Sequence, residues 1–390
     1  LVMSKDYKDN LPITQKKFME ELRRYQKGSV SRRHFMGVTG LGTAMAVMGG
    51  AAPLLLPNKA HAYGDVGDRL VFSTWPNYHN PANMEEFTEA TGVNVQINAF
   101  GSNEEMLAKL QAGATGWDVF VPTNYTLSYY VELDLIQELD LSRIPNYDPN
   151  SQDPMFANPA TINGKVYAVL KNWGHTGIVY NSANLSTAPK SWKDFFDITM
   201  GEGSGHTIVH DYQLTTIGAA LCALGYSFNS IDASELAEAE KILLDAKPHL
   251  FAISDDMQPG MRSGDGWMSI CWNGDGLQLN KDMPELQYTL ATDGGEIWSD
   301  FYVVTKDAPH EEAAYAFINY LLDPYIQTRE FASHGYASGD SRVDAMLPAE
   351  TAENSILFPA AELLNGLEFG AAQTMTDPLR AELMARFKAA

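Results

Sequence analysis

The chain has 390 residues, and 45% of them are hydrophobic, so it can bury two cores of ordinary size rather than one. Its formal net charge is -22 at pH 7; residues 1–62 hold 10 Lys and Arg against 4 Asp and Glu, which leaves 17 bases against 45 acids in residues 63–390. Such an acidic surface disfavours nucleic acid and anionic membrane as partners and favours cations.

An export signal is predicted within residues 1–62. Arg32 and Arg33 precede an uncharged, glycine-rich run over 37–57, and the small-x-small sequence Ala60-His61-Ala62 follows it. This order is typical of a twin-arginine (Tat) signal peptide, so we expect export to the periplasm with cleavage after Ala62. The alternative is a membrane anchor, because the run approaches the ~20 residues that span a bilayer. The cleavage-like site favours a removed signal.

The stretch 70–78 (LVFSTWPNY) predicts a buried strand that ends in a loop rich in aromatic residues. Residues 70–72 are continuously apolar, and Pro76 cannot donate to a strand ladder. Trp75, Asn77 and Tyr78 are therefore expected just past the carboxyl end of the strand, where ligands bind in open α/β sheets.

Helix-like and strand-like patterns then alternate along the chain, which favours an α/β fold. Helices are expected over 83–91, 103–111, 235–245 and 311–322, and strands over 93–97, 118–122, 165–170, 177–181 and 301–305. Ser102 is a predicted N-cap with Glu104 and Glu105 in the first turn after it. A loop region is expected over 136–163.

A second aromatic turn is predicted at 268–275 (MSICWNGD). A short apolar run again delivers a tryptophan, Trp272, and then a carboxylate, Asp275, into a turn that contains glycine. The two aromatic loops could therefore face each other across one cleft.

Cofactor and metal signals are weak. Residues 63–390 contain two cysteines, Cys222 and Cys271; a bridge between them is possible, but their apolar surroundings favour two buried thiols. His206 and His210 are separated by three residues that read as a strand, so they do not form a helical metal pair. We expect no metal and no cofactor.

A set of short motifs, in collinear order from about residue 70 almost to the C-terminus, carries a family resemblance. The segments are 75–78 (WPNY), 87–95 (FTEATGVNV), 102–110 (SNEEMLAKL), 118–122 (DVFVP), 224–227 (LGYS), 272–274 (WNG), 294–295 (GG), 298–300 (WSD) and 317–324 (FINYLLDP). Together they resemble the spermidine/putrescine-binding proteins of ABC importers.

The resemblance implies an α/β fold of the two-lobe, type II periplasmic-binding-protein class that closes on its ligand about hinge crossovers. Lobe one would comprise 69–171 with 289–322, and lobe two 172–288 with 323–390. It also implies a role in transport, the permease subunits of an ABC transporter as partners, and a monomer.

The resemblance further assigns candidate ligand-binding residues, and the chemistry of an amine site agrees with them. Carboxylates hold a protonated amine in charge-assisted hydrogen bonds, and aromatic faces add about 0.5–2 kcal/mol each. The aromatic box would be formed by Trp75, Tyr78, Tyr125, Trp272 and Trp298, and the acidic anchors by Asp275 and Asp300. Asp211, on the turn after 207–210, is a further candidate anchor. Trp298 could instead be core, and Asp275 and Asp300 could cap helices.

Departures from the family pattern leave the ligand open. Asn77, Tyr212 and Thr215 stand where polyamine binders often carry acids, so fewer ammonium groups should be recognised. Putrescine, another small amine, an amino acid or other zwitterion and a carbohydrate all remain candidates. An exported hydrolase is disfavoured, because neither a Gly-x-Ser-x-Gly nor a His-Glu-x-x-His motif occurs, so we expect a binding protein rather than an enzyme.

Overall fold

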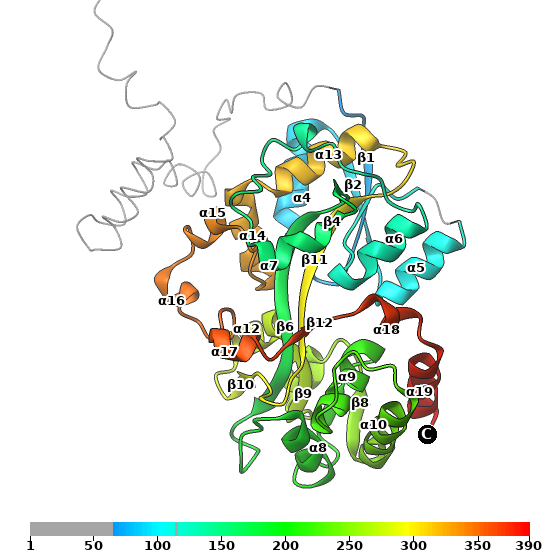
Figure 1. Cartoon of the computed structure of the whole chain (residues 1–390). Coiled ribbons are helices and arrows are strands. Elements are labelled where there is room, and N and C mark those ends of the chain that lie inside the picture. Colours follow the sequence, from blue (N-terminus) through cyan, green and yellow to red (C-terminus); the bar gives the residue numbers. More distant parts are fainter. Residues whose placement is uncertain (1–64, 114–115) are drawn as a thin grey trace, which may run out of the picture. The chain divides into compact units, whose positions relative to one another are not determined.

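The central feature of the computed structural model, which describes residues 65–113 and 116–390, is a ten-stranded mixed β-sheet (Figure 1). Along its main path the strand order is β2-β1-β3-β11-β6-β9-β7-β8. These strands are β1 (Arg69–Thr74), β2 (Asn94–Ala99), β3 (Val119–Phe120), β6 (Val169–Asn181), β7 (Thr207–Val209), β8 (Leu250–Ile253), β9 (Met268–Trp272) and β11 (Glu296–Val304). Two further strands, β10 (Leu286–Thr289) and β12 (Glu368–Phe369), pair with β6 and β11, and β4 (Thr161–Ile162) pairs with β5 (Lys165–Val166) in a separate hairpin.

Two parallel groups of strands are joined by one long antiparallel pair. β1 is parallel to β2 and β3, and β7 is parallel to β8 and β9. Between the groups, β6 and β11 run antiparallel to each other, and every residue of β11 is buried. Because β6 pairs with β11 over 169–175 and with β9 over 176–180, this single strand links both groups.

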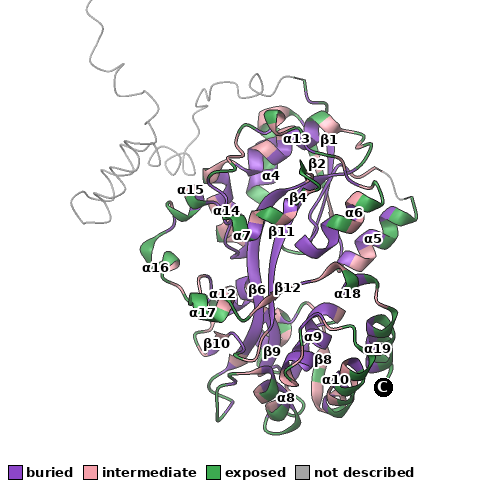
Figure 2. Ribbon diagram, viewed as in Figure 1, coloured by how far each residue is buried: buried purple, intermediate pink, exposed green. Residues whose placement is uncertain are grey.

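Helices cover each parallel group (Figures 1 and 2), and their outward faces carry the exposed residues. Around β1, β2 and β3 lie α4 (Pro81–Thr91), α5 (Asn103–Gln111), α6 (Leu127–Glu132), α13 (Glu311–Leu321) and α14 (Pro324–His334). Around β7, β8 and β9 lie α8 (Trp192–Met200), α9 (Gln213–Ala223), α10 (Ala233–Ala246), α12 (Asn273–Asp282) and α19 (Pro378–Ala389). The short helix α11 (Gln258–Ser263) packs on β7, since a Cβ on Gly260 would stand 2.9 Å from Ile208. Shorter helices are α7 (Pro154–Ala157), α15 (Ser341–Asp344), α16 (Ala349–Ala352), α17 (Ala361–Leu364) and α18 (Ala372–Thr376).

Local signals explain the first two of these helices. The side chain of Ser102 accepts a hydrogen bond from the Glu105 amide at 3.1 Å, which caps α5 as predicted, and the helix has the predicted bounds. α4 ends at Gly92, whose φ of 80° lies in the left-handed region that glycine adopts without strain. The mixed α/β class predicted from the alternating patterns is confirmed.

The middle of the chain differs from the prediction in two places. The strands expected at 165–170 and 177–181 are largely one strand, β6, because residues 171–176 (KNWGHT) are buried between partner strands although they lack an apolar pattern. The expected loop over 136–163 contains α7 and β4. In both places contacts with distant segments stabilise a secondary structure that the local sequence does not favour.

The strand predicted at 301–305 begins earlier, at Glu296. Its first residues alternate between large polar or aromatic side chains and core residues such as Ile297, so the apolar periodicity is hidden. Asp300 therefore lies inside β11, at a β-bulge before Phe301, and does not cap a helix.

Several other predictions can be set against the structure. Cys222 and Cys271 are buried and unpaired, as predicted. Residues 65–113 and 116–390 contain no cluster of three potential metal ligands, and none of the helices described there is both long and apolar enough to cross a bilayer. The export signal within residues 1–62 lies outside the described residues. The lobe boundaries stay a prediction.

Gly174, which pairs with Trp298 in the β6–β11 ladder, should tolerate no side chain. A Cβ on Gly174 would collide with Asn273 and would stand 2.5 Å from Cζ2 of Trp298. We expect Gly174→Ala to lower the free energy of unfolding by about 1–3 kcal/mol through overpacking. Urea denaturation would measure it, with Gly366→Ala as control, since the nearest atom to a Cβ there is 3.5 Å away. Equal stability of the two variants would show that the space around Gly174 is loosely packed.

Candidate functional site

A cavity of about 990 Å³ opens where the two parallel groups of strands present their carboxyl ends. Residues that follow β1, β2, β3, β7, β8 and β9 all contribute to its wall: Trp75, Gly101, Thr123, Tyr212, Asp255 and Asp275. This is the position at which open α/β sheets bind ligands. Of the predicted site residues, seven line the cavity: Trp75, Asn77, Tyr78, Trp272, Asp275, Trp298 and Asp300.

The loop after β1 supplies one aromatic wall. The indole Nε1 of Trp75 donates to the Val121 carbonyl at 3.1 Å, which fixes the ring next to Phe100. The hydroxyl of Tyr78 contacts the side chain of Asn172 and donates to Asp300 Oδ2 at 2.9 Å. Both rings are therefore held in place before any ligand arrives.

The turn after β9 supplies the opposite side of the cavity. Trp272 packs against the His210 ring with centroids 4.4 Å apart, and Asp275 lies in the first turn of α12. The carboxylate of Asp275 accepts from Gln258 Nε2 at 2.6 Å and from the Tyr336 hydroxyl at 2.8 Å. Burial raises the pKa of Asp275, while these two donors lower it. The two aromatic loops thus share one cavity.

One face of β11 forms the floor. Because side chains alternate along a strand, Glu296, Trp298 and Asp300 point to the same side, and all three line the cavity. Burial is the main cause that raises the pKa of Glu296 to about 8 and that of Asp300 to about 7. Thr176 donates to Glu296 at 2.6 Å, which partly opposes that shift.

Two predicted site residues lie elsewhere. Tyr125 is buried behind the wall, where its hydroxyl contacts that of Tyr212, the residue that lines the cavity. Asp211 is exposed and forms an ion pair with Lys388 of α19. In this structure neither side chain belongs to the cavity lining.

The lining is acidic and aromatic. Five carboxylic acids line the cavity: Asp255, Asp256, Asp275, Glu296 and Asp300. The only Lys or Arg among the described lining residues is Arg262, which is engaged by Asp282 at 2.9 Å. A cation that enters this cavity can form charge-assisted hydrogen bonds with the carboxylates and can pack against the aromatic faces.

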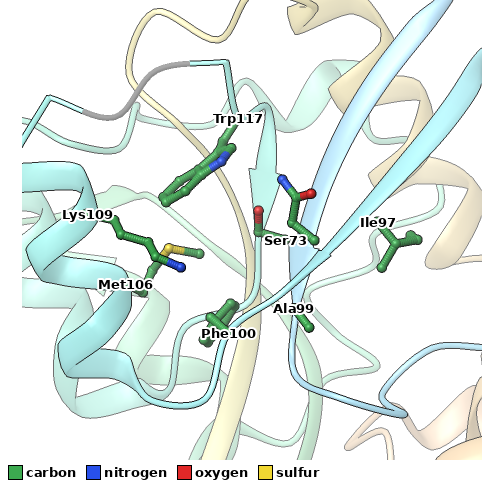
Figure 3. Close-up of a pocket in the computed structure, with 8 residues that line it drawn as sticks. Ser73, Ile97, Ala99, Phe100, Met106, Lys109 and Trp117 are labelled. Atoms are coloured by element: carbon green, nitrogen blue, oxygen red, sulfur yellow. The ribbon is translucent and has the colours of Figure 1, made fainter.

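A second, smaller cavity of about 350 Å³ lies between the β1–β2 edge and α5 (Figure 3). Its lining residues in the described part of the chain include Phe100, Met106 and Trp117 and no carboxylate. Lys109 at its edge pairs with Glu105. It therefore lacks the anchors of the larger cavity.

Comparison with known proteins places the chain in a family. The model of the bacterial extracellular solute-binding proteins matches residues 82–359. The chain belongs to this family. Its fold is the two-lobe, type II fold of periplasmic binding proteins, as predicted.

Relatives of this solute-binding protein include the spermidine/putrescine-binding periplasmic protein of Escherichia coli, 28% identical over 342 residues that cover 86% of this chain and 97% of that one. A putrescine/agmatine-binding protein of Pseudomonas aeruginosa is 26% identical and covers 74% of this chain and 83% of its own. Among solved structures, a putative spermidine/putrescine ABC transporter protein from Listeria monocytogenes has a TM-score of 0.76 at 27% identity, and the match covers 83% of this chain and 99% of that one.

Sequence reasoning missed several lining residues of this solute-binding protein. Asp255 and Asp256 follow the apolar run of β8, so the rule that found Asp275 could have found them. Glu296 stands two and four residues before Trp298 and Asp300, and a period of two would have placed it on the same face. Tyr336, beyond the end of α14, carries no local signal, because only the packing of that helix brings it to the cavity.

The buried acids should make the stability of the ligand-free protein depend on pH. Burial raises the pKa of Asp255 and Asp300 to about 7 and that of Glu296 to about 8, so the folded state holds protons that the unfolded chain has released. We therefore expect the free energy of unfolding to increase by on the order of 1 kcal/mol as pH falls from 8 to 7. Denaturant titrations at the two values would measure it.

Below pH 7 the trend should level off. Burial lowers the pKa of His175 and His210 to about 3. As pH falls below 7, these histidines therefore take up protons in the unfolded chain but stay neutral in the folded protein, which favours unfolding. Glu296→Gln should reduce the slope between pH 8 and 7. A stability that decreases over that interval in the parent protein would contradict the assignment of these acids as buried and protonated.

Proposed function

We propose that this protein is the exported solute-binding component of an ABC importer and that it captures a small cationic amine of the polyamine type in the larger cavity. The observation that carries the proposal is the set of desolvated acids on aromatic walls. Asp300 is 5% exposed and Glu296 2%, and an isolated buried carboxylate is costly unless a cation compensates it. Relatives named as spermidine/putrescine-binding and putrescine/agmatine-binding proteins support the same ligand class.

Each lining group has a role in this proposal. Asp275 and Asp300 accept hydrogen bonds from the ligand, and Glu296, Asp255 and Asp256 add negative potential. Trp75, Tyr78, Trp272 and Trp298 pack against methylene groups and ammonium faces. Asn77, with a left-handed φ of 56°, turns the loop at the rim. Tyr125 would act indirectly by positioning Tyr212, and Asp211 would bind ligand only if its pair with Lys388 opened.

The proposed role in transport follows from ligand capture in the cavity. We infer that the lobes, 69–171 with 289–322 and 172–288 with 323–390, close on the ligand and then present it to the permease subunits. The protein would act as a monomer, without nucleic acid, metal or cofactor. A catalytic role is disfavoured, because binding needs only the cavity and a hinge.

A second ligand class is favoured by one observation. The Trp298 indole Nε1 is buried and has no hydrogen-bond partner among residues 65–113 and 116–390. A donor of this kind is satisfied by an acceptor oxygen, and Arg262 at the rim would bind a carboxylate in competition with its partner Asp282. An amine that also carries a hydroxyl or carboxyl group, such as an amino alcohol or a zwitterion, would fit these donors.

Removing one anchor tests the amine site. A thermal-shift panel of amines, amino acids and sugars would first identify a ligand, since a molecule that binds only the native state raises its melting temperature. For a cationic amine found in this way, Asp275→Asn should cost about 1.5–3 kcal/mol, or roughly ten- to hundredfold in Kd by calorimetry. Trp272→Ala should cost a comparable amount.

The matched control is Asp197→Asn, the same acid-to-amide change on the exposed face of α8. It should leave Kd unchanged. If Asp275→Asn binds the amine as tightly as the parent while both remain folded, the hypothesis that Asp275 anchors the ammonium group is rejected. An uncharged natural ligand then becomes the better explanation.

We also propose that export follows the Tat pathway, with Arg32 and Arg33 as its signal and Ala62 as the last residue removed. Intact-mass measurement of the exported protein should give a chain that starts at Tyr63. Arg32→Lys with Arg33→Lys should hold the precursor in the cytoplasm. An exported form that keeps residues 1–62 would instead support an anchor.

A further inference from the structure

A lysine lies buried next to the cavity without forming a hydrogen bond. Lys171, on β6, is 5% exposed, and its Nζ has no hydrogen-bond partner among the described residues. The ammonium lies 3.9 Å from the centroid of the Tyr78 ring and 5.9 Å from that of Tyr302. Burying an ammonium group without hydrogen-bond acceptors costs free energy. We therefore looked for a function of Lys171 in the neighbouring cavity.

Two carboxylates attract Lys171 from nearby. Glu330, on α14, is already held by the Asn80 amide at 3.1 Å and by Asn83 Nδ2 at 2.6 Å, and it does not line the cavity. Asp300 does line the cavity, and Coulomb attraction to Lys171 favours its ionised form. Lys171 is thus a counter-charge for two carboxylates, Glu330, which affects it more, and Asp300, the floor carboxylate that a ligand would meet.

Tyr78 connects the lysine to the ligand space. Its ring lines the cavity, whereas Lys171 does not, and its hydroxyl donates to Asp300. A ligand ammonium at Asp300 would therefore use the same ring and the same carboxylate as Lys171. Two cations that share these groups in a medium of low polarity repel each other.

We propose that Lys171 is a specificity-determining residue, a built-in ammonium that lies behind the Tyr78 ring, next to the Asp300–Tyr78 part of the cavity, and so limits the number of ammonium groups in the ligand. This inference rests on the proposed function. The one ligand ammonium binds near Asp275, Asp255 and Asp256 instead. The Tyr336 ring, whose hydroxyl donates to Asp275, lies between this group and the Tyr78 ring. The end near Asp300 and Trp298 takes an uncharged segment or a hydroxyl, in agreement with the unpaired indole donor of Trp298.

Three probes with the same four-carbon chain separate the two ends of the ligand. They are 1-aminobutane, 4-amino-1-butanol and 1,4-diaminobutane, which differ only in the group at the second end. In the parent protein the diamine should bind no more than a few-fold tighter than the amino alcohol. In Lys171→Met, which keeps the side-chain volume and removes the charge, the preference for the diamine should rise by roughly tenfold or more, because Asp300 then lacks its internal cation. Calorimetric titration at pH 7 would give the ratios.

The controls distinguish specificity from structure. Lys171→Arg keeps the charge and should keep the parent ratio, and Lys165→Met removes an exposed lysine that pairs with Glu138 and should also keep it. Lys171→Gln provides a second uncharged variant should the methionine variant fold poorly, and melting curves accompany every titration. A diamine preference that stays at the parent value in folded Lys171→Met and Lys171→Gln would overturn the proposal, as would an equal loss of affinity for all three probes.

The two hypotheses fail in different ways. If the parent protein binds none of the three amines, the proposed function fails and this inference fails with it. If the amines bind and the ratio is insensitive to Lys171, the amine function stands and only the role of Lys171 is rejected.

Discussion

The antiparallel pairing of β6 with β11 is the constraint on which the rest of this structure depends. It joins two parallel groups of strands, and it is buried along nearly its whole length. Because these strands cross from one group to the other, the carboxyl ends of both groups open onto the same space. Close packing at Gly174 lets the Trp298 ring lie against β6. Without this pair the residues after β1 and those after β9 would have no common cavity.

The same pairing explains the unusual electrostatics. β11 carries Glu296 and Asp300 into the floor of the cavity, where burial removes most of their water. A carboxylate in such a place either takes up a proton or acquires a cation. With pKa values of about 8 for Glu296 and about 7 for Asp300, raised mainly by burial, the protonated and ionised forms are closely balanced near neutral pH in the absence of ligand. A bound ammonium would shift that balance to the ionised form. Binding and proton release are then two aspects of one equilibrium.

Lys171 adds an asymmetry to this arrangement. It lies on β6 behind Tyr78, so the protein itself provides a cation for one end of the cavity. The carboxylate of Asp275 accepts hydrogen bonds from two neutral donors, Gln258 and Tyr336, which favour its ionised form against the effect of burial. An internal ammonium next to Asp300 is expected to reduce the number of ligand ammonium groups that the cavity can hold.

The sequence by itself determined the elements whose signals are local. The apolar run of 70–72, the Ser102 cap and the glycine at 92 place β1, α5 and the end of α4 because each depends on residues within one turn. The rule that ligands bind after the carboxyl ends of parallel strands also grouped Trp75, Tyr78, Trp272 and Asp275, and all four line the larger cavity. Tertiary structure decided what depends on distant partners. Residues 171–176 form a strand only because β9 and β11 pair with β6, and Glu296, Tyr336 and Lys171 reach the site through packing that leaves no pattern in the sequence. Tyr125 and Asp211 show the converse, since a side chain next to a strand end can still be turned away from the cavity by a nearer partner, Tyr212 or Lys388.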